Sequence, residues 1–154
     1  MLVAERRYRN AERTLAGALT TLERGDESAP LAEALTLQGV IRARLGTYQA
    51  SVNVLRRAAE MAESVGAQAT AGQAVLSLIE EHGATWRLRP AEAFESYLKA
   101  DMLLKDTQDA EDVARLRACA PVVMKRLTTV RLGDKNFARR VRFTSSRRSK
   151  SNGR

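Results

Sequence analysis

The chain has few of the residues that cross-link or interrupt a fold. Its 154 residues include one cysteine, Cys119, and one histidine, His82, so no disulfide can form within the chain and no metal site or catalytic pair can use two histidines. Three prolines and nine glycines occur, and six of these twelve residues lie at the ends of segments of periodic apolar residues: Gly25, Pro30, Gly46, Gly66, Gly83 and Pro90. No run of 18 or more apolar residues is present, so we expect no membrane span.

Sequence motifs for catalysis are also missing. The chain has no glycine-rich phosphate loop, no paired-cysteine motif and no Gly-x-Ser-x-Gly elbow around a nucleophile. We therefore expect a protein that is not an enzyme and that uses no cofactor and no metal. The first residues lack the apolar core of a secretory signal, and the scarcity of cysteine favours a cytoplasmic location.

Charge is divided unevenly along the chain. Residues 1–124 carry 15 Lys or Arg against 17 Asp or Glu, a net charge of −2. Residues 125–154 carry 11 Lys or Arg against one Asp, a net charge of +10. The chain as a whole has a formal net charge of +8, and its excess positive charge lies in the C-terminal tail.

Apolar residues recur at helical spacing over the first 127 residues. Alanine and leucine dominate these positions, and both are strong helix formers. The pattern predicts six helices, over residues 3–24, 30–45, 48–65, 68–82, 90–105 and from 107 to about 127. Glycines follow the first four of these segments, and prolines open the second and the fifth, as expected at helix ends and helix starts.

A skeleton of aromatic, small and apolar residues repeats along these helices. It is complete in two places and partial in a third: Tyr48, Ser51, Leu55 and Ala58; Tyr8, Ala11, Leu15 and Ala18; and Ala93, Tyr97 and Ala100. The small residues are separated by 40 positions from Ala11 to Ser51 and by 42 positions from Ser51 to Ala93. A fixed period in this range predicts stacked helical hairpins.

The segment 32–65 resembles a tetratricopeptide repeat, whose pattern is Trp-x2-Leu-Gly-x2-Tyr, then Ala-x3-Phe and a closing Pro. Gly39 keeps the glycine of the first helix, and Gly46 and Tyr48 match the turn. The second helix is matched by Ser51, Leu55 and Ala58. The departures from the pattern are Leu35, Gln38 and Arg42, which replace Trp, Leu and Tyr, and a missing closing proline. The resemblance covers about residues 1–127. The repeats of this chain are similar to the long-helix repeats of bacterial regulatory proteins.

This resemblance implies an all-α fold. It would be an α-solenoid of about three antiparallel helical hairpins, about six helices, in a right-handed superhelix. The units would be residues 1–25, 32–65 and 68–105, followed by a final helix at 107–127. A generic alanine-rich bundle with accidental spacing is the alternative interpretation.

The resemblance also implies a function, that of a protein–protein interaction scaffold binding a partner peptide or helix in the concave groove of the repeats. In this family the first helix of each hairpin lines the groove. The corresponding residues here are Glu33, Thr36, Val40, Arg44, Gln73, Ser77, Glu80 and Glu81. The Asn, Lys and Arg set with which some members clamp a C-terminal carboxylate is missing. For any one of these residues, a merely solvated position is the alternative.

Three side chains outside the groove are also candidates. Trp86 lies in a loop beside Arg87 and Arg89, where it is either an interface anchor or a cover over the gap between hairpins. His82 is expected to cap the end of its helix, where the dipole favours a cation. Cys119 lies on an alanine-rich helical stripe and is expected to be a buried structural thiol.

From residue 128 the helical pattern fails, and the basic, serine-rich stretch 128–154 is expected to be disordered. Its arginines are possible phosphate contacts: Arg139, Arg140, Arg142, Arg147 and Arg148. The alternative function is therefore a nucleic-acid-associated regulatory protein whose tail contacts phosphates while the helical body senses or dimerises. Docking on an acidic surface, or no role at all, are the other interpretations of this tail.

The first helix has no hairpin partner before it in the sequence. Its apolar edge should therefore be covered, either by a second copy of the chain or by the rest of a larger protein. The first option predicts a homodimer that forms through the N-terminal helix.

Overall fold

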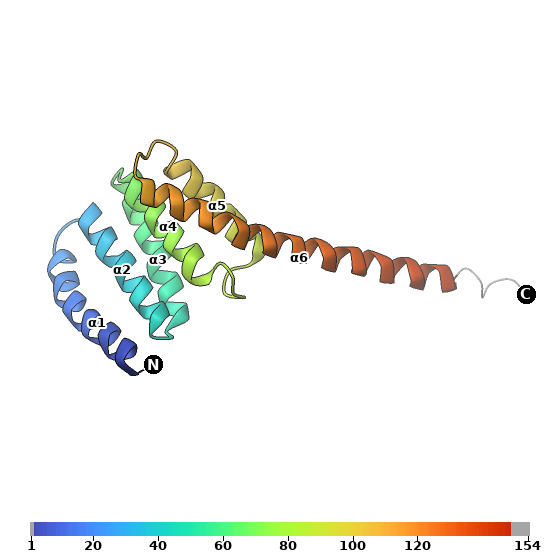
Figure 1. The fold of residues 1–154 in the computed structure, drawn as a ribbon, viewed down its shortest axis with the longest axis horizontal. Helices are drawn as coiled ribbons and strands as arrows, with labels where there is room; N and C mark the ends of the chain where they lie inside the picture. The colour runs from blue at the N-terminus through green and yellow to red at the C-terminus, as the bar shows by residue number, and fades with distance from the viewer. Residues whose placement is uncertain (1, 149–154) are drawn as a thin grey trace, which may run out of the picture.

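A computed structural model describes the backbone of residues 2–148 and the side chains of residues 3–129. Within residues 2–148 the chain forms six α-helices and no strand (Figure 1). The helices are α1 (Leu2–Leu22), α2 (Ala29–Arg44), α3 (Tyr48–Ser64), α4 (Gln68–His82), α5 (Pro90–Leu103) and α6 (Ala110–Arg148). The all-α fold expected from the sequence is confirmed, and the ends of α1 to α5 lie within two residues of the predicted positions.

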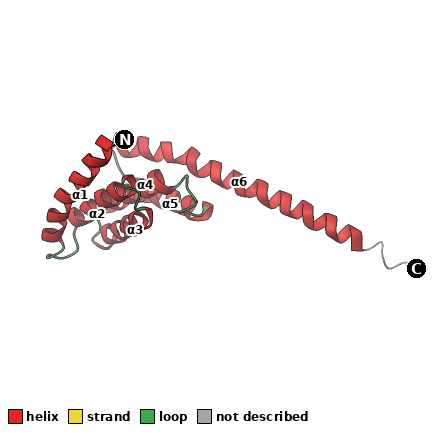
Figure 2. Ribbon diagram, turned by 90° about the horizontal axis from the view of Figure 1, so that it is seen from below, coloured by secondary structure: helices red, strands yellow, loops and turns green. Residues whose placement is uncertain are grey.

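Each helix packs against the next one along the chain, and two further contacts join alternate helices. These join α2 to α4 and α4 to α6, so α2, α4 and α6 form a continuous layer. Figures 1 and 2 show the six helices arranged in sequence order, with the chain reversing direction at each connection. This is the repeat-like arrangement expected of stacked hairpins.

The turns after α2 and α3 have the same geometry. Gly46 and Gly66 have positive φ values of 83° and 74°, which glycine adopts readily because it has no Cβ. Gly46 N–H donates to the carbonyl of Ala43 at 3.1 Å, and Thr47 N–H donates to that of Arg42 at 2.9 Å. Equivalent bonds form around Gly66. These bonds satisfy the last carbonyls of each helix and allow the next helix to start within three residues.

The core lies between the helices and is built from leucine and alanine. Leu35, Leu55, Leu76 and Ile79 are among the largest fully buried side chains. Burial of such a side chain contributes about 1.5–3 kcal/mol. Gly39 allows α2 to cross α3 closely, since a Cβ there would lie 2.5 Å from Leu55 Cγ.

The small residues of the repeated skeleton are buried in the second and third units but not in the first. Ser51 on α3 and Ala93 on α5 have no exposed surface, whereas Ala11 and Ala18 on α1 are exposed. The inward residue of α1 that the sequence pattern missed is Leu19, which is buried. The described part of the chain places only α2 against α1, so one flank of α1 has no neighbour to cover its alanines.

The C-terminal segment differs from the sequence expectation. Residues 128–148 continue α6 as a helix, whereas the sequence pattern predicted a helix that ends near residue 127; residues 149–154 lie outside the described residues. The segment 128–148 contains no proline and a single glycine, Gly133. It also extends a helix that is already packed on the body, so it avoids the cost of nucleation. Both views show this part of α6 projecting away from the other helices (Figures 1 and 2).

Candidate functional site

The predicted groove residues on α2 lie along one exposed stripe of that helix. Glu33 is exposed and accepts a hydrogen bond from Thr70 of α4 at 3.5 Å. Thr36 donates instead to the carbonyl of Ala32 in its own helix, at 2.9 Å. Val40 is half-buried and packs against the core. The structure therefore leaves this stripe partly accessible.

Sequence reasoning missed Leu37, which lies on the same stripe of α2. It is a large apolar side chain with 52% of its surface exposed. It is four residues after Glu33 and three before Val40, a spacing that places all three on one side of a helix. The pattern of α2 alone could have identified it, because it is apolar and lies off the buried face that Leu31, Leu35 and Gly39 define.

At the C-terminal end of the layer, the predicted residues pair with one another across helices. Arg44 of α2 donates two hydrogen bonds to Glu81 of α4, at 2.8 and 3.2 Å. The Arg44 side chain remains about half exposed, and an ion pair of this kind contributes at most about 1 kcal/mol. The pair therefore sets the register of α2 against α4 more than it stabilises the fold.

The predicted residues of α4 are joined to α6, a contact that the sequence did not indicate. Gln73 donates to Asp112 at 2.9 Å, and Asp112 is buried. Arg115 donates to both carboxylate oxygens of Glu80, at 2.9 Å each, and to Ser77 Oγ at 3.1 Å. The bonds to Glu80 raise the pKa of Arg115, which stays charged.

These contacts form a polar ladder, defined as the pairs Arg44–Glu81, Gln73–Asp112 and Arg115–Glu80. Four of the eight predicted groove residues, Arg44, Gln73, Glu80 and Glu81, are members of it. Their polar groups are therefore engaged between helices, although the side chains of Arg44 and Glu80 keep exposed surface. The α2 stripe adds an exposed apolar side chain, Leu37. Asp112 and Arg115 could have been found from their i, i+3 spacing near the start of α6.

A buried hydrogen-bonded group joins α2, α3 and α4. Ser51 and His82 have no exposed surface. Ser51 Oγ donates to the carbonyl of Gly39 at 2.6 Å and lies 2.8 Å from His82 Nε2. Since the hydroxyl hydrogen is used on Gly39, we assign the hydrogen of the second bond to Nε2. His82 is then the neutral Nε2–H tautomer, and its Nδ1 has no partner among the described residues.

His82 does not cap its helix as the sequence predicted. Its ring reaches across the hairpin to Ser51 and does not turn back to the carbonyls of α4. Burial lowers the pKa of His82, and the nearby Arg87 guanidinium lowers it further. The Ser51–His82 pair offers no nucleophile, because both side chains are buried and the hydroxyl hydrogen is held by Gly39.

Cys119 is a buried thiol, as the sequence predicted. Burial, with the nearby Glu80 carboxylate, raises the pKa of Cys119 to about 11. The thiol is therefore protonated at neutral pH, which is typical of a structural cysteine and not of a nucleophile.

Trp86 does not cover the gap between hairpins, since 83% of its surface is exposed. The loop that carries it is nevertheless fixed. Leu88 is fully buried, and Arg126 of α6 donates hydrogen bonds to the carbonyls of Leu88 and Gly83, the latter at 3.0 Å. Thr85 Oγ1 donates to the carbonyl of His82 at 2.8 Å. The loop thus presents Trp86 to solvent from a well-defined backbone.

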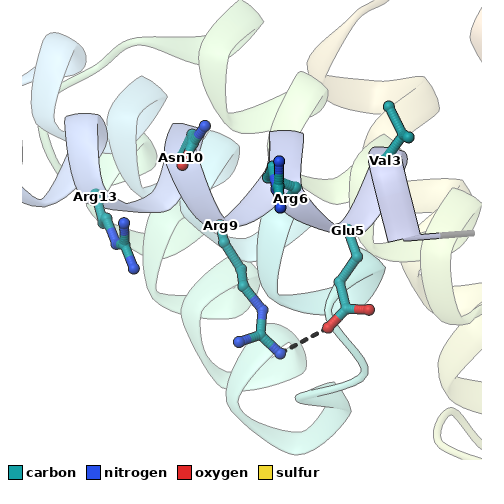
Figure 3. Close-up of a pocket in the computed structure, with 6 residues that line it drawn as sticks. All are labelled: Val3, Glu5, Arg6, Arg9, Asn10 and Arg13. Carbon is teal, nitrogen blue, oxygen red and sulfur yellow. Dashed lines mark hydrogen bonds and ion pairs between the residues drawn. The ribbon is translucent and has the colours of Figure 1, made fainter.

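A hollow of about 740 Å³ lies along α1, near its N-terminus. Its described lining is mainly basic and polar: Val3, Glu5, Arg6, Arg9, Asn10 and Arg13 (Figure 3). Arg9 and Glu5 form an ion pair at 2.6 Å, which Figure 3 shows as a dashed line. Sequence reasoning did not identify these residues, because it treated α1 only as an apolar stripe.

The predicted phosphate contacts of the tail lie on the backbone of α6: Arg139, Arg140, Arg142, Arg147 and Arg148. Their side chains lie outside the described residues, so their role stays a prediction. Among the described residues no cluster of histidine, cysteine or acidic side chains could hold a metal ion. No helix in the described part of the chain is long and apolar enough to cross a membrane.

Comparison of the chain with protein-family models, with curated proteins and with solved structures found no match. The tetratricopeptide-like character of the repeats therefore remains a resemblance in sequence pattern.

Proposed function

We propose that this chain is a protein-interaction scaffold that holds a partner peptide or helix along the layer formed by α2, α4 and α6. The observation that carries the proposal is Leu37, whose side chain is half exposed on the α2 flank of that layer, on the stripe with Glu33 and Val40. With the half-buried Val40 beside it and Glu33 one turn away, Leu37 gives the stripe an apolar centre and a charged rim, the arrangement found in protein interfaces. The polar ladder supports the proposal, because it holds the layer rigid before a partner binds.

A selection from a random peptide library displayed on phage, followed by calorimetric titration of the enriched peptides, tests this function. The variant Leu37→Arg should bind the selected peptides at least about ten-fold more weakly, since it places a charge in the apolar centre of the interface. Leu98→Arg on α5 is the matched control, because Leu98 is also half exposed but lies on a helix that packs against α4 and α6. The Leu98 variant should bind as the parent chain does.

Two results would refute the scaffold. The first is a selection that enriches no peptide above background. The second is equal affinity of the parent chain and Leu37→Arg, provided that both give the same helical circular dichroism. Leu37 is exposed, so the substitution should not disturb folding.

A second candidate function is supported by the charge of the tail. Residues 125–154 carry a net charge of +10, and the backbone of residues 125–148 continues α6 as a helix. A cationic segment of this kind binds the phosphates of nucleic acid without reading its sequence. In this proposal the helical body senses a signal or dimerises, and the dimer through α1 belongs to the same proposal.

A further inference from the structure

Three segments of the chain meet at one end of the helical layer. They are the N-terminal half of α1, the turn between α2 and α3, and the loop between α4 and α5. Six residues define the surface that they share, which we call the basic–aromatic edge: Arg9, Arg13, Thr47, Tyr48, Trp86 and Arg87. None of these segments belongs to the polar ladder.

The aromatic part of the edge is built around Arg87. Its guanidinium carbon lies 3.6 Å from the centre of the Tyr48 ring and 5.3 Å from that of Trp86. Tyr48 and Trp86 are both exposed. Among the described side chains no carboxylate lies within ion-pair distance of Arg87. The cation is therefore held by the two rings and is available to a carboxylate from outside.

The loop that carries Trp86 is ordered before any partner arrives. Leu88 anchors it in the core, and Arg126 holds its two ends through the carbonyls of Gly83 and Leu88. A tryptophan on a preorganised loop loses little conformational entropy when it binds, which makes it an effective anchor.

The basic part of the edge continues from the turn onto α1. A hollow of about 330 Å³ separates Arg9 and Arg13 from Leu45 and Thr47. Thr47 precedes Tyr48, so this hollow lies directly beside the aromatic part. Arg9 and Arg13 also line the larger hollow on α1, together with Arg6 (Figure 3). Glu12 lines the smaller hollow as well, so arginines lie on both sides of the turn that carries Thr47 and Tyr48, with one carboxylate among them.

We propose that the basic–aromatic edge binds an acidic peptide segment that carries one large apolar side chain. The apolar side chain packs on Trp86 and Tyr48, and the flanking carboxylates pair with Arg87 and with Arg9 and Arg13. The only acidic side chains on this part of α1 are Glu5, which pairs with Arg9, and Glu12, so the surface keeps a net positive charge that an acidic partner complements. The inference goes beyond the proposed function, because this edge does not include Leu37 and would bind its peptide independently of the α2 stripe.

Trp86 makes the test direct, because it is the single tryptophan of the chain and its fluorescence reports on this site alone. The probe is a synthetic ten-residue peptide of glutamate with one central leucine, titrated into the full chain. We expect a saturable blue shift of the emission as the leucine covers the indole. A peptide with lysine in place of glutamate should give no saturable change.

Three variants show which residues act. The double variant Arg9→Ala and Arg13→Ala should weaken binding at least about five-fold, and so should Arg87→Ala. Arg117→Ala on α6 is the matched control, since Arg117 is exposed and has no ion-pair partner among the described side chains. Arg9 and Arg13 are exposed, so replacing them should not disturb folding. The double variant therefore still measures the contribution of the arginines to binding if Arg87→Ala changes the packing of Tyr48.

The inference is overturned if the glutamate peptide leaves the emission unchanged, if the lysine peptide binds as well, or if the double variant binds like the parent chain. Failure here is distinguishable from failure of the scaffold itself. A library selection that enriches neutral or basic peptides, with binding that depends on Leu37, would retain the proposed function and reject the acidic partner.

Discussion

His82 Nδ1 is a buried nitrogen without a hydrogen-bond partner among the described residues, and it belongs to the single histidine of the chain. Burial of the ring costs little free energy in its neutral form, because its Nε2–H group donates a hydrogen bond to Ser51 Oγ. Protonation would add a buried charge beside Arg87 and a second N–H group without an acceptor. Through His82, the stability of the packing between α3 and α4 should therefore depend on pH.

The free energy of unfolding should fall as the pH drops below about 6.5, the pKa of an unperturbed histidine. The folded pKa lies lower, so the unfolded chain binds a proton that the folded chain resists. The histidine contribution is fully present above the unfolded pKa, and it is lost progressively as the pH falls toward the folded pKa. Urea unfolding at pH 8, 7, 6 and 5.5 measures this loss.

The control is His82→Gln, whose amide can still donate to Ser51 Oγ but does not titrate. Its free energy of unfolding should change less between pH 7 and pH 5.5 than that of the parent chain. Equal losses for the two proteins over this range would contradict a buried neutral histidine.

At the scale of the elements, the crossing of α2 and α3 depends on the absence of one Cβ. A Cβ on Gly39 would lie 2.5 Å from Leu55 Cγ and 2.7 Å from Leu55 Cδ2. Leu55 is fully buried, so its side chain cannot move out into solvent to make room without leaving the core. The crossing of α4 and the end of α5 repeats this arrangement, because a Cβ on Gly72 would lie 2.5 Å from Leu104 Cγ.

We expect Gly39→Ala to lower the free energy of unfolding by about 1–3 kcal/mol, the usual cost of overpacking a core. Gly17→Ala on α1 is the matched control, because nothing lies within 4 Å of a Cβ built there. Both changes gain the same helix propensity, up to about 1 kcal/mol, so their difference isolates the contact with Leu55. Denaturant unfolding compares the two, and equal stability of both variants would show that α2 and α3 can separate without cost.

The helix ends could be predicted where a local residue determines them. Gly46 and Gly66 terminate α2 and α3 through their positive φ values, and Pro90 begins α5, so these bounds follow from the sequence alone. The role of His82 could not be predicted, since its partner Ser51 lies 31 residues away and only the packed hairpins bring the two together. The pairing of Gln73 with α6 likewise depends on packing between helices, whereas Leu37 could have been found from the pattern of α2 alone.

At the scale of the whole molecule, the body and the end of α6 are distinct. The last core residue is Val123, and the last described side chain that bonds to another segment is Arg126. Beyond the body, α6 projects alone (Figure 1). Composition alone predicted disorder for this segment, because composition does not include the packed helix from which it continues. The body should therefore fold with the same stability whether or not the projecting segment is present.

A chain that ends at Thr129 tests the second candidate function, because it keeps the body and removes nine of the 26 lysines and arginines. If the tail contacts phosphates, the full chain should bind a random-sequence DNA duplex with an affinity that falls steeply with salt, by a slope of about −0.9 per phosphate contacted. The shortened chain should bind more weakly and with a flatter slope, while its urea midpoint stays unchanged.

As a control within the full chain, Arg139, Arg140 and Arg142 are replaced by glutamine in one variant, and Thr144, Ser145 and Ser146 are replaced by glutamine in another. Only the first replacement should reduce the slope, and equal affinities for the full and shortened chains at every salt concentration would exclude the tail as a nucleic-acid contact.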